Sequence, residues 1–110
     1  MQTQPQSVYR VDKFAVPASA RNEFMARVST IRQMLDTMNG CRQNLILEQV
    51  SGPGEFNVVT IVEWDSADSL EKAKTAVATR YAEINFNPLE TIARLGIKAD
   101  IANYSLYSGA

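Results

Sequence analysis

A chain of 110 residues is long enough for one domain and too short for two, and a domain of this size buries roughly two-thirds of its unfolded surface. A net charge of −1, with 21% charged residues, favours neither nucleic acid nor an anionic membrane as a partner. No apolar run could span a bilayer, and the single cysteine, Cys41, excludes an internal disulfide, so we expect a cytoplasmic protein.

The first third of the chain predicts a tail, a strand and a helix. Residues 1–7 are polar, so we expect a disordered tail ahead of a single domain over residues 8–110. Apolar residues alternate unevenly with charged ones over residues 8–16, which favours a strand. Over residues 18–38 the apolar side chains recur at steps of three and four, which is typical of an amphipathic helix. Gly40 can provide the left-handed stop that such helices favour.

Two strands joined by a tight turn follow. Residues 41–50 carry apolar side chains on both faces, and Gly52-Pro53-Gly54 turns the chain back, so this strand should form a hairpin with the next one. The next strand, residues 55–65, should lie at the centre of the sheet. One of its faces presents Val58, Thr60, Val62 and Trp64, and the other presents Val59, Ile61 and Glu63. Because both rows are mainly apolar, the sheet needs cover on both faces.

A second helix, a short third helix and a last strand complete the pattern. The side chains of residues 65–68 suit a helix start, and an apolar stripe then continues to Ile84. Asn87 followed by proline predicts a short helix over residues 88–95, and residues 100–107 predict a strand. The order β-α-β-β-α-β predicts an α+β, ferredoxin-like fold, in which both main helices lie on one face of a four-stranded antiparallel sheet.

The helices leave the other face of this sheet bare. Apolar residues on both faces of the middle strands predict that the bare face is buried, and a second copy of the same sheet is the simplest cover. We therefore expect a homodimer with its sheets packed face to face, because a monomer would expose an apolar patch of about several hundred Å².

The order of the elements, the run from Val59 to Ser66 and the strand–proline–helix opening over residues 12–24 together resemble the antibiotic-biosynthesis monooxygenase family, which belongs to the dimeric α/β-barrel superfamily. The resemblance covers residues 8–107. It implies a homodimeric barrel with a ligand pocket between the sheet and the helices of each subunit. Known members include cofactor-free oxygenases that act on polycyclic phenols, haem-degrading enzymes and quinol oxygenases.

Three positions depart from the pattern of that family. The haem-degrading branch has a histidine on the helix after the tryptophan, whereas this chain has no histidine and carries Lys74 at about that place. A protonated lysine cannot ligate iron, so the sequence does not favour haem degradation of this type. Asp12 replaces the first-strand asparagine of the oxygenase branches, and Thr60 replaces an asparagine of one oxygenase subgroup.

A cofactor-free oxygenase converts its substrate into an electron-rich anion, so its site needs a base, hydrogen-bond donors and an apolar slot. Asp12 is the candidate base, because desolvation beside the helices would raise its pKa. The alternative is a half-exposed aspartate paired with a lysine or arginine of a helix. Trp64 is the second candidate catalytic residue, since its ring could stack on an aromatic ligand and its N–H could donate a hydrogen bond. The alternative is a strand-end anchor packed against the second helix.

Four residues are candidate substrate-binding groups: Phe14, Thr60, Tyr81 and Asn103. Phe14 shares a strand face with Asp12 and could form a pocket wall or pack in the core. Tyr81 belongs to the apolar stripe of the second helix and could hold a phenolate, whereas its neighbour Arg80 should face solvent. Asn103, on the last strand, could bind a polar group or line the dimer seam.

The leading hypothesis is a monooxygenase that acts, without metal or flavin, on a small aromatic, phenolic or quinol-like metabolite. A non-catalytic homodimer that binds a small apolar ligand is the alternative. The same strand order builds RNA-binding modules, but a central strand rich in valine and isoleucine lacks the interleaved aromatic and basic residues that RNA needs. A lone cysteine without histidine offers no zinc site of the usual ligands.

Overall fold

The computed structural model describes residues 7–107, so most of the predicted tail, residues 1–7, lies outside the described residues. The strands within that range are β1 (Val8–Ala15), β2 (Cys41–Glu48), β3 (Val58–Trp64) and β4 (Lys98–Tyr104). The α-helices are α1 (Arg21–Asp36), α2 (Ala67–Glu83) and α3 (Pro88–Arg94), and a single 3₁₀ turn (Ala18–Ala20) precedes α1. Every predicted helix and strand is present, although several boundaries differ.

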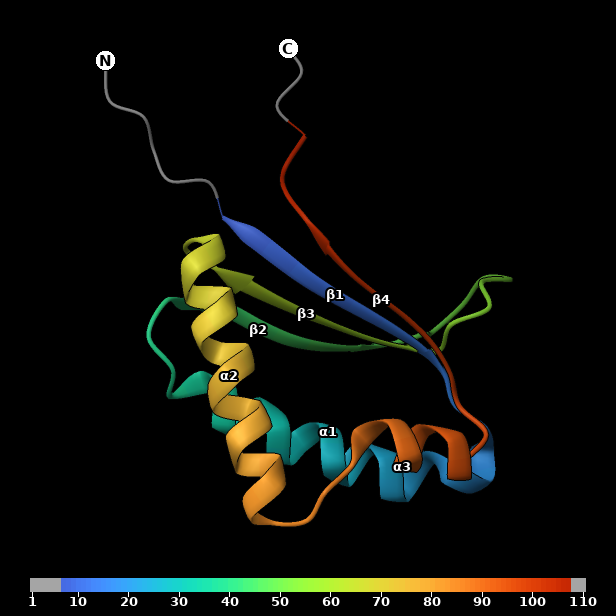
Figure 1. Cartoon of the computed structure of the whole chain (residues 1–110). Helices are drawn as coiled ribbons and strands as arrows, with labels where there is room; N and C mark the ends of the chain where they lie inside the picture. Colours follow the sequence, from blue (N-terminus) through green and yellow to red (C-terminus); the bar gives the residue numbers. More distant parts are fainter. Residues whose placement is uncertain (1–6, 108–110) are drawn as a thin grey trace.

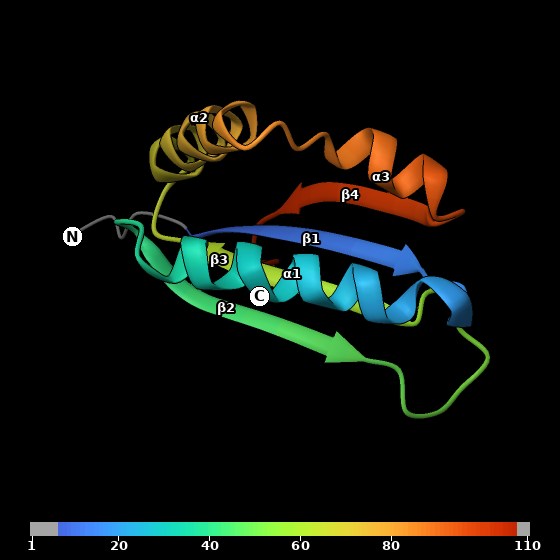
Figure 2. The same cartoon turned by 90° about the horizontal axis from the view of Figure 1, so that it is seen from below.

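The four strands form one antiparallel sheet in the order β2-β3-β1-β4. Figure 1 shows all the helices on one side of this sheet, and Figure 2 shows α1 along the middle strands with α2 and α3 toward the β4 side. This arrangement confirms the predicted α+β, ferredoxin-like fold. No helix within residues 7–107 is long and apolar enough to cross a membrane.

The central strand begins later than predicted. β3 starts at Val58 rather than at residue 55, because the side chain of Asn57 binds the backbone of Val16 at the end of β1. The Asn57 Oδ1 accepts a hydrogen bond from the Val16 N–H at 2.8 Å, and its Nδ2 donates one to the Val16 carbonyl at 3.0 Å. Asn57 therefore closes the end of the β1–β3 ladder with its side chain.

The last strand and the first helix also differ from their predicted bounds. β4 spans Lys98–Tyr104 instead of residues 100–107, because its partner β1 starts near Tyr9, which pairs with Tyr104. The predicted helix over residues 18–38 is a 3₁₀ turn followed by α1, which ends at Asp36. Gly40 is left-handed, with a φ of 88°, but it lies in the turn before β2 and does not end α1, whose cap is the right-handed Thr37.

The predicted caps of the second and third helices are confirmed. The Ser66 side chain accepts a hydrogen bond from the Ser69 N–H at 3.1 Å and so caps α2. The Asn87 side chain accepts one from the Glu90 N–H at 3.2 Å, and proline occupies the first turn of α3. Each cap satisfies a backbone N–H that has no partner within its own helix.

The core on the helix side of the sheet is divided into two clusters. The first joins the end of β1 to α1 and the residue before β4 and contains Phe14, Val16, Ala20, Phe24, Val28, Val58 and Ile97. The second joins the end of β3 to the first turns of α2 and contains Val62, Trp64, Leu70 and Ala73. The middle of the sheet, between the clusters, is therefore not filled by core side chains.

The opposite face of the sheet is apolar and has no covering element among residues 7–107. Leu45 pairs with Ile61 across β2 and β3, and Ile61 pairs with Val11 of β1, so these side chains form one row on that face. Leu45 is 41% exposed and Leu47 is 45% exposed. The structure thus shows the bare apolar face that the sequence predicted.

Substitution of Gly40 tests how closely the turn after α1 packs on the start of α2. A Cβ at Gly40 would lie 2.5 Å from the Ser69 Oγ and 2.8 Å from the Asp65 Oδ1, in a left-handed conformation. Gly52 is also left-handed, with φ at 96°, but has nothing within 4 Å. We expect Gly40→Ala to lower the free energy of unfolding by about 1–3 kcal/mol more than Gly52→Ala, because only the former adds a clash.

Urea denaturation of the two variants measures this difference. Equal losses of stability would show that the contacts around Gly40 relax without cost and would contradict the expectation.

Candidate functional site

A cavity of about 420 Å³ lies between the sheet and the helices, in the space between the two core clusters. All four strands and all three α-helices contribute side chains to its lining, which is mainly apolar. Its volume falls within the range of ligand pockets, about 300–1,000 Å³. The cavity is therefore large enough for a small organic ligand.

A row of four paired residues, one from each strand, runs across the lining of the cavity. Asp12 of β1 pairs with Thr60 of β3 on one side and with Ile101 of β4 on the other, and Thr60 pairs with Ile46 of β2. All four side chains line the cavity. This cross-strand row places one carboxylate and one hydroxyl side by side between two aliphatic side chains.

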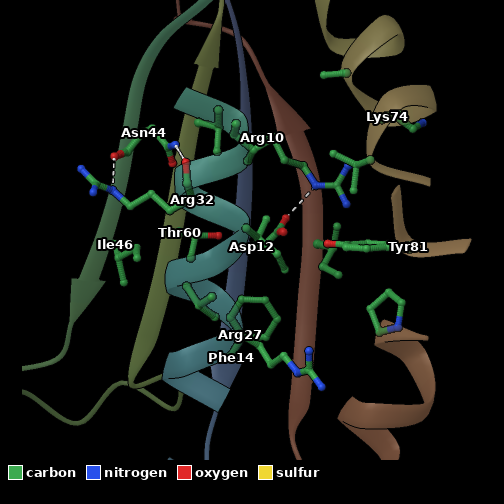
Figure 3. A pocket seen from close by; sticks show the side chains of 18 of the residues that line it. Arg10, Asp12, Phe14, Arg27, Arg32, Asn44, Ile46, Thr60, Lys74 and Tyr81 are labelled. Atoms are coloured by element: carbon green, nitrogen blue, oxygen red, sulfur yellow. Dashed lines mark hydrogen bonds and ion pairs between the residues drawn. The ribbon is translucent and has the colours of Figure 1, made fainter. Parts of the chain in front are cut away.

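The carboxylate of Asp12 is half-buried and paired with Arg10 of the same strand face. The Arg10 Nε donates to the Asp12 Oδ1 at 2.7 Å, and the two side chains are 29% and 22% exposed (Figure 3). Burial raises the pKa of Asp12, and the hydrogen bond and charge of Arg10 act in the opposite direction without cancelling the rise. Asp12 is thus a carboxylate with increased proton affinity inside a mainly apolar cavity.

Tyr81 of α2 faces Asp12 across the cavity, and Figure 3 shows its hydroxyl directed toward the carboxylate. Burial raises the pKa of the Tyr81 phenol, and the nearby charge of Asp12 raises it further. The Tyr81 ring packs edge-on against Phe86, with the ring centroids 5.1 Å apart. This contact fixes the ring at the point where the chain leaves α2, so the hydroxyl stays over the cross-strand row.

A buried amide closes the cavity on the β2 side. Asn44 is 8% exposed, and its Nδ2 donates to the Arg32 carbonyl at 2.8 Å and to the Asp36 Oδ1 at 3.0 Å. The Arg32 Nε donates in return to the backbone carbonyl of Asn44 at 3.0 Å. These bonds tie β2 to α1, and Figure 3 shows that they turn the Arg32 guanidinium away from Tyr81.

The two predicted aromatic residues of the sheet line the cavity and also belong to the core. Trp64 is 2% exposed and packs with Leu70 and Ala73 of α2, so it has the position of the strand-end anchor described above. Phe14 is 6% exposed and meets Phe24 of α1 edge-on at 4.9 Å. Both rings contribute walls at opposite ends of the cavity.

The remaining predicted residue is not brought into the site. Asn103 pairs with Arg10 and so shares the helix-facing side of the sheet, but it is exposed and does not line the cavity. Arg80 lies outside the lining as well, and its guanidinium pairs with Glu83 at 3.4 Å. Tyr81, by contrast, points inward, as its place in the apolar stripe of α2 indicates.

Four basic residues of the lining were not among the predicted site residues: Arg10, Arg27, Arg32 and Lys74. Arg10 alternates with Asp12 and Phe14 along β1, so strand periodicity could have identified it. Arg27 lies one turn after Phe24 on α1, and Lys74 lies one turn after Leu70 on α2. Both therefore flank the buried stripe of their helix, where a long side chain reaches the edge of a cavity.

The lining does not fit haem bound through histidine, because the chain contains no histidine and Lys74 is a cationic side chain. Residues 7–107 also contain no group of three or more histidine, cysteine, aspartate or glutamate side chains that could hold a metal ion. The polar groups of the lining are one carboxylate, hydroxyls, the Asn44 amide and basic side chains.

Comparison with known proteins identifies the family and the fold. The family model described as "Antibiotic biosynthesis monooxygenase" matches residues 7–80. A conserved protein from Methanosarcina mazei has a TM-score of 0.69 at 19% identity, over 92% of this chain and 93% of that one. No curated protein matches the chain.

Two further solved structures have a described activity. SnoaB, a cofactor-independent oxygenase from Streptomyces nogalater, has a TM-score of 0.65 at 16% identity, over 94% of this chain and 96% of that one. The haem-degrader MhuD from Mycobacterium tuberculosis has a TM-score of 0.68 at 17% identity, over 94% and 98% of the two chains. At these identities the likeness shows the fold alone.

Removal of Arg10 tests its influence on Asp12. We expect Arg10→Gln to raise the pKa of Asp12 further above its ordinary value of 3.8, because the variant loses the hydrogen bond and the charge that lower it. The carboxyl carbon resonance of Asp12, followed by NMR against pH, measures the pKa. Lys13→Gln on the opposite face of β1 is the control and should leave the titration unchanged.

The same change alters the pH dependence of stability. The pKa of Asp12 is higher in the folded state than in the unfolded state. The contribution of Asp12 to folding stability is therefore fully present below the unfolded pKa and is lost as the pH rises through the folded pKa. In Arg10→Gln this loss should occur at higher pH. An unchanged or lower Asp12 pKa in the variant would contradict the assigned role of Arg10.

Proposed function

Because the chain belongs to the antibiotic biosynthesis monooxygenase family, we propose that it is a cofactor-independent oxygenase that acts on a small aromatic, phenolic or quinol-like metabolite. The structural likeness to SnoaB, an oxygenase that is itself cofactor-independent, is consistent with this proposal. The observation that carries it is Asp12, a carboxylate of raised pKa in a mainly apolar cavity of ligand size.

Such a reaction needs a base that removes a proton from the substrate. A general base works best when its pKa lies nearer the working pH than that of a free aspartate, and burial moves the pKa of Asp12 in that direction. The hydroxyls of Thr60 and Tyr81 lie on either side of the carboxylate and can donate hydrogen bonds to the substrate anion that forms. Phe14 and Trp64 supply apolar walls for the rings.

The electrons for the reaction come from the substrate. Asp12 takes a proton from an activated C–H₂ group, and the resulting carbanion reduces O₂ and forms a C–O bond. Asp12 then returns the proton to the peroxide anion, which restores the carboxylate. Loss of water from the peroxide converts that carbon to a carbonyl, so one oxygen atom enters the product and the other leaves as water. The protein's part is to bind the rings, accept the proton and stabilise the anion in a mainly apolar cavity.

We also propose that the protein is a homodimer joined through the bare face of its sheet. The row of Leu45, Ile61 and Val11, extended by Leu47, offers a continuous apolar surface there. Antiparallel sheets bury such a face against a second layer, and within residues 7–107 the chain supplies none. A second copy provides a surface of matching shape and chemistry.

A non-catalytic binding protein of the same fold is the second candidate. One observation favours it: Asp12 already has a partner, since the Arg10 Nε lies 2.7 Å from its Oδ1 and opposes the effect of burial. A carboxylate held in this way can orient a ligand without removing a proton from it. Both candidates use the same cavity, so turnover distinguishes them.

Asp12→Asn tests the oxygenase. With anthrones, naphthols and quinols as substrates, we expect the variant to lose about 10²-fold or more in the rate of oxygen uptake while it keeps its ligand affinity, because the amide cannot accept the proton. Oxygen-electrode assays and calorimetry measure the two quantities. Asp68→Asn, an exposed position that pairs with Lys72 at 3.0 Å, is the matched control and should retain wild-type rates.

Two outcomes would contradict the oxygenase. One is full activity in Asp12→Asn, which would place the base elsewhere. The other is ligand binding without oxygen uptake by the wild-type protein across all three substrate classes, which would favour the binding protein.

Leu47→Lys tests the homodimer. A charge on the bare face should prevent the two sheets from packing, because burying an unpaired ammonium is costly. We expect the wild-type protein to sediment at twice the 12.2 kDa mass of the chain and the variant to sediment as a folded monomer. Ile84→Lys is the control, since Ile84 is 43% exposed, close to the 45% of Leu47, but follows α2 on the helix side. A wild-type monomer would disprove the proposal.

A further inference from the structure

The lining of the cavity carries an excess of positive charge that the chain as a whole does not. The chain has 11 basic and 12 acidic residues, whereas the lining contains four basic side chains and one acidic side chain, Asp12. The basic residues are Arg10, Arg27, Arg32 and Lys74. All but Arg10 are exposed, so this excess lies at the mouth of the cavity, where it creates a positive potential that favours an anion.

Three of these four basic side chains already bind other groups of the protein. Arg10 binds the carboxylate of Asp12, and the Arg32 Nε is bound to the backbone carbonyl of Asn44 and turned away from Tyr81. The Lys74 ammonium lies 3.5 Å from a carboxylate oxygen of Glu71 on the same helix. None of these three is therefore fully available to a ligand.

Arg27 differs from the other three. It forms no ion pair and no hydrogen bond within residues 7–107, so the N–H groups of its guanidinium remain available. Its guanidinium carbon lies 4.6 Å from the centroid of the Phe86 ring, which holds the group in place by a cation–π contact without using those donors in hydrogen bonds. Figure 3 shows Arg27 near Phe14, and its guanidinium lies on the other side of Tyr81 from that of Arg10.

The Arg27 guanidinium is exposed, rests against the Phe86 ring and forms no ion pair within residues 7–107, although its charge also acts on Glu23 one turn earlier on α1. Such a group matches a carboxylate, which it can bind through two parallel hydrogen bonds. The apolar walls of the cavity suit a flat ring system at the same time. We propose that the ligand of this cavity is an aromatic carboxylate, whose rings lie over the row of Thr60 and Asp12 and whose acidic group is bound by Arg27. This inference rests on the cavity being the substrate site of the proposed function and adds the charge of the substrate.

A matched pair of ligands tests the proposal. Hydroxynaphthoic acid and its primary amide share ring, hydroxyl and shape, and only the acid is ionised at neutral pH. We expect calorimetry under argon to show about tenfold tighter binding of the acid, the size expected for a charge-assisted pair. Added salt should reduce the difference, because ions screen the attraction at a partly exposed site.

Substitutions of Arg27 identify the residue responsible. Arg27→Gln should weaken binding of the acid about tenfold and leave binding of the amide nearly unchanged, and Arg27→Lys should restore part of the loss, since lysine keeps the charge without the bidentate geometry. Arg80→Gln removes the same charge from α2 outside the cavity and is the control. Its ligand affinities should match those of the wild-type protein.

Three results would overturn the proposal: equal affinity for acid and amide, an equal loss for both ligands in Arg27→Gln, or no binding of either ligand. These binding experiments do not measure oxygen uptake, so the aromatic carboxylate proposal and the oxygenase proposal can fail independently. If the protein prefers the acid but takes up no oxygen, the aromatic carboxylate proposal stands and the oxygenase proposal fails. If the protein oxidises neutral substrates and does not prefer the acid, the oxygenase proposal stands and the aromatic carboxylate proposal fails.

Discussion

The packing of α2 against Trp64 determines where the rest of the site lies. Trp64 is almost fully buried, and of the α2 side chains only Leu70 and Ala73, from the first turns, join it in the core. The helix is therefore fixed to the sheet at one end, and its other end lies toward the β4 side, from which the Tyr81 hydroxyl points toward Asp12. The chain then packs tightly again only at the cluster around Phe14, so the space between the clusters remains open.

Burial and pairing act in opposite directions at Asp12. Withdrawal from water raises its pKa, and Arg10, two residues earlier on the same strand, lowers it. The proton affinity of the carboxylate therefore depends on burial, which is the larger effect, and on one ion pair within a single strand. Tyr81 responds to the same charge, because Asp12 contributes to the raised pKa of its phenol. The three side chains form one coupled electrostatic unit.

Local patterns were sufficient to predict the fold, because alternation, helical periodicity and the caps at Ser66 and Asn87 each act within a few residues. The late start of β3 could not be predicted in this way, since it depends on a bond between Asn57 and Val16, 41 residues apart. Strand parity placed Asp12 and Phe14 on one face, but the partner of Asp12 is Arg10 of the same strand and not the helix residue that the alternative proposed. The facing of Asn103 stayed open in the sequence, and only its pairing with Arg10 places it on the helix-facing side, where it is exposed.

The separation of the two core clusters has a consequence for how such a sequence can change over time. Side chains such as Trp64 and Phe14 stabilise the fold from the two ends of the sheet, whereas Thr60 and Asp12, in the row between them, belong to neither core cluster. Exchanges at these two positions therefore cost less folding stability than exchanges in the clusters and still alter what the cavity accepts. Selection can act on ligand preference here almost independently of foldability, so one scaffold can diversify through a single line of residues.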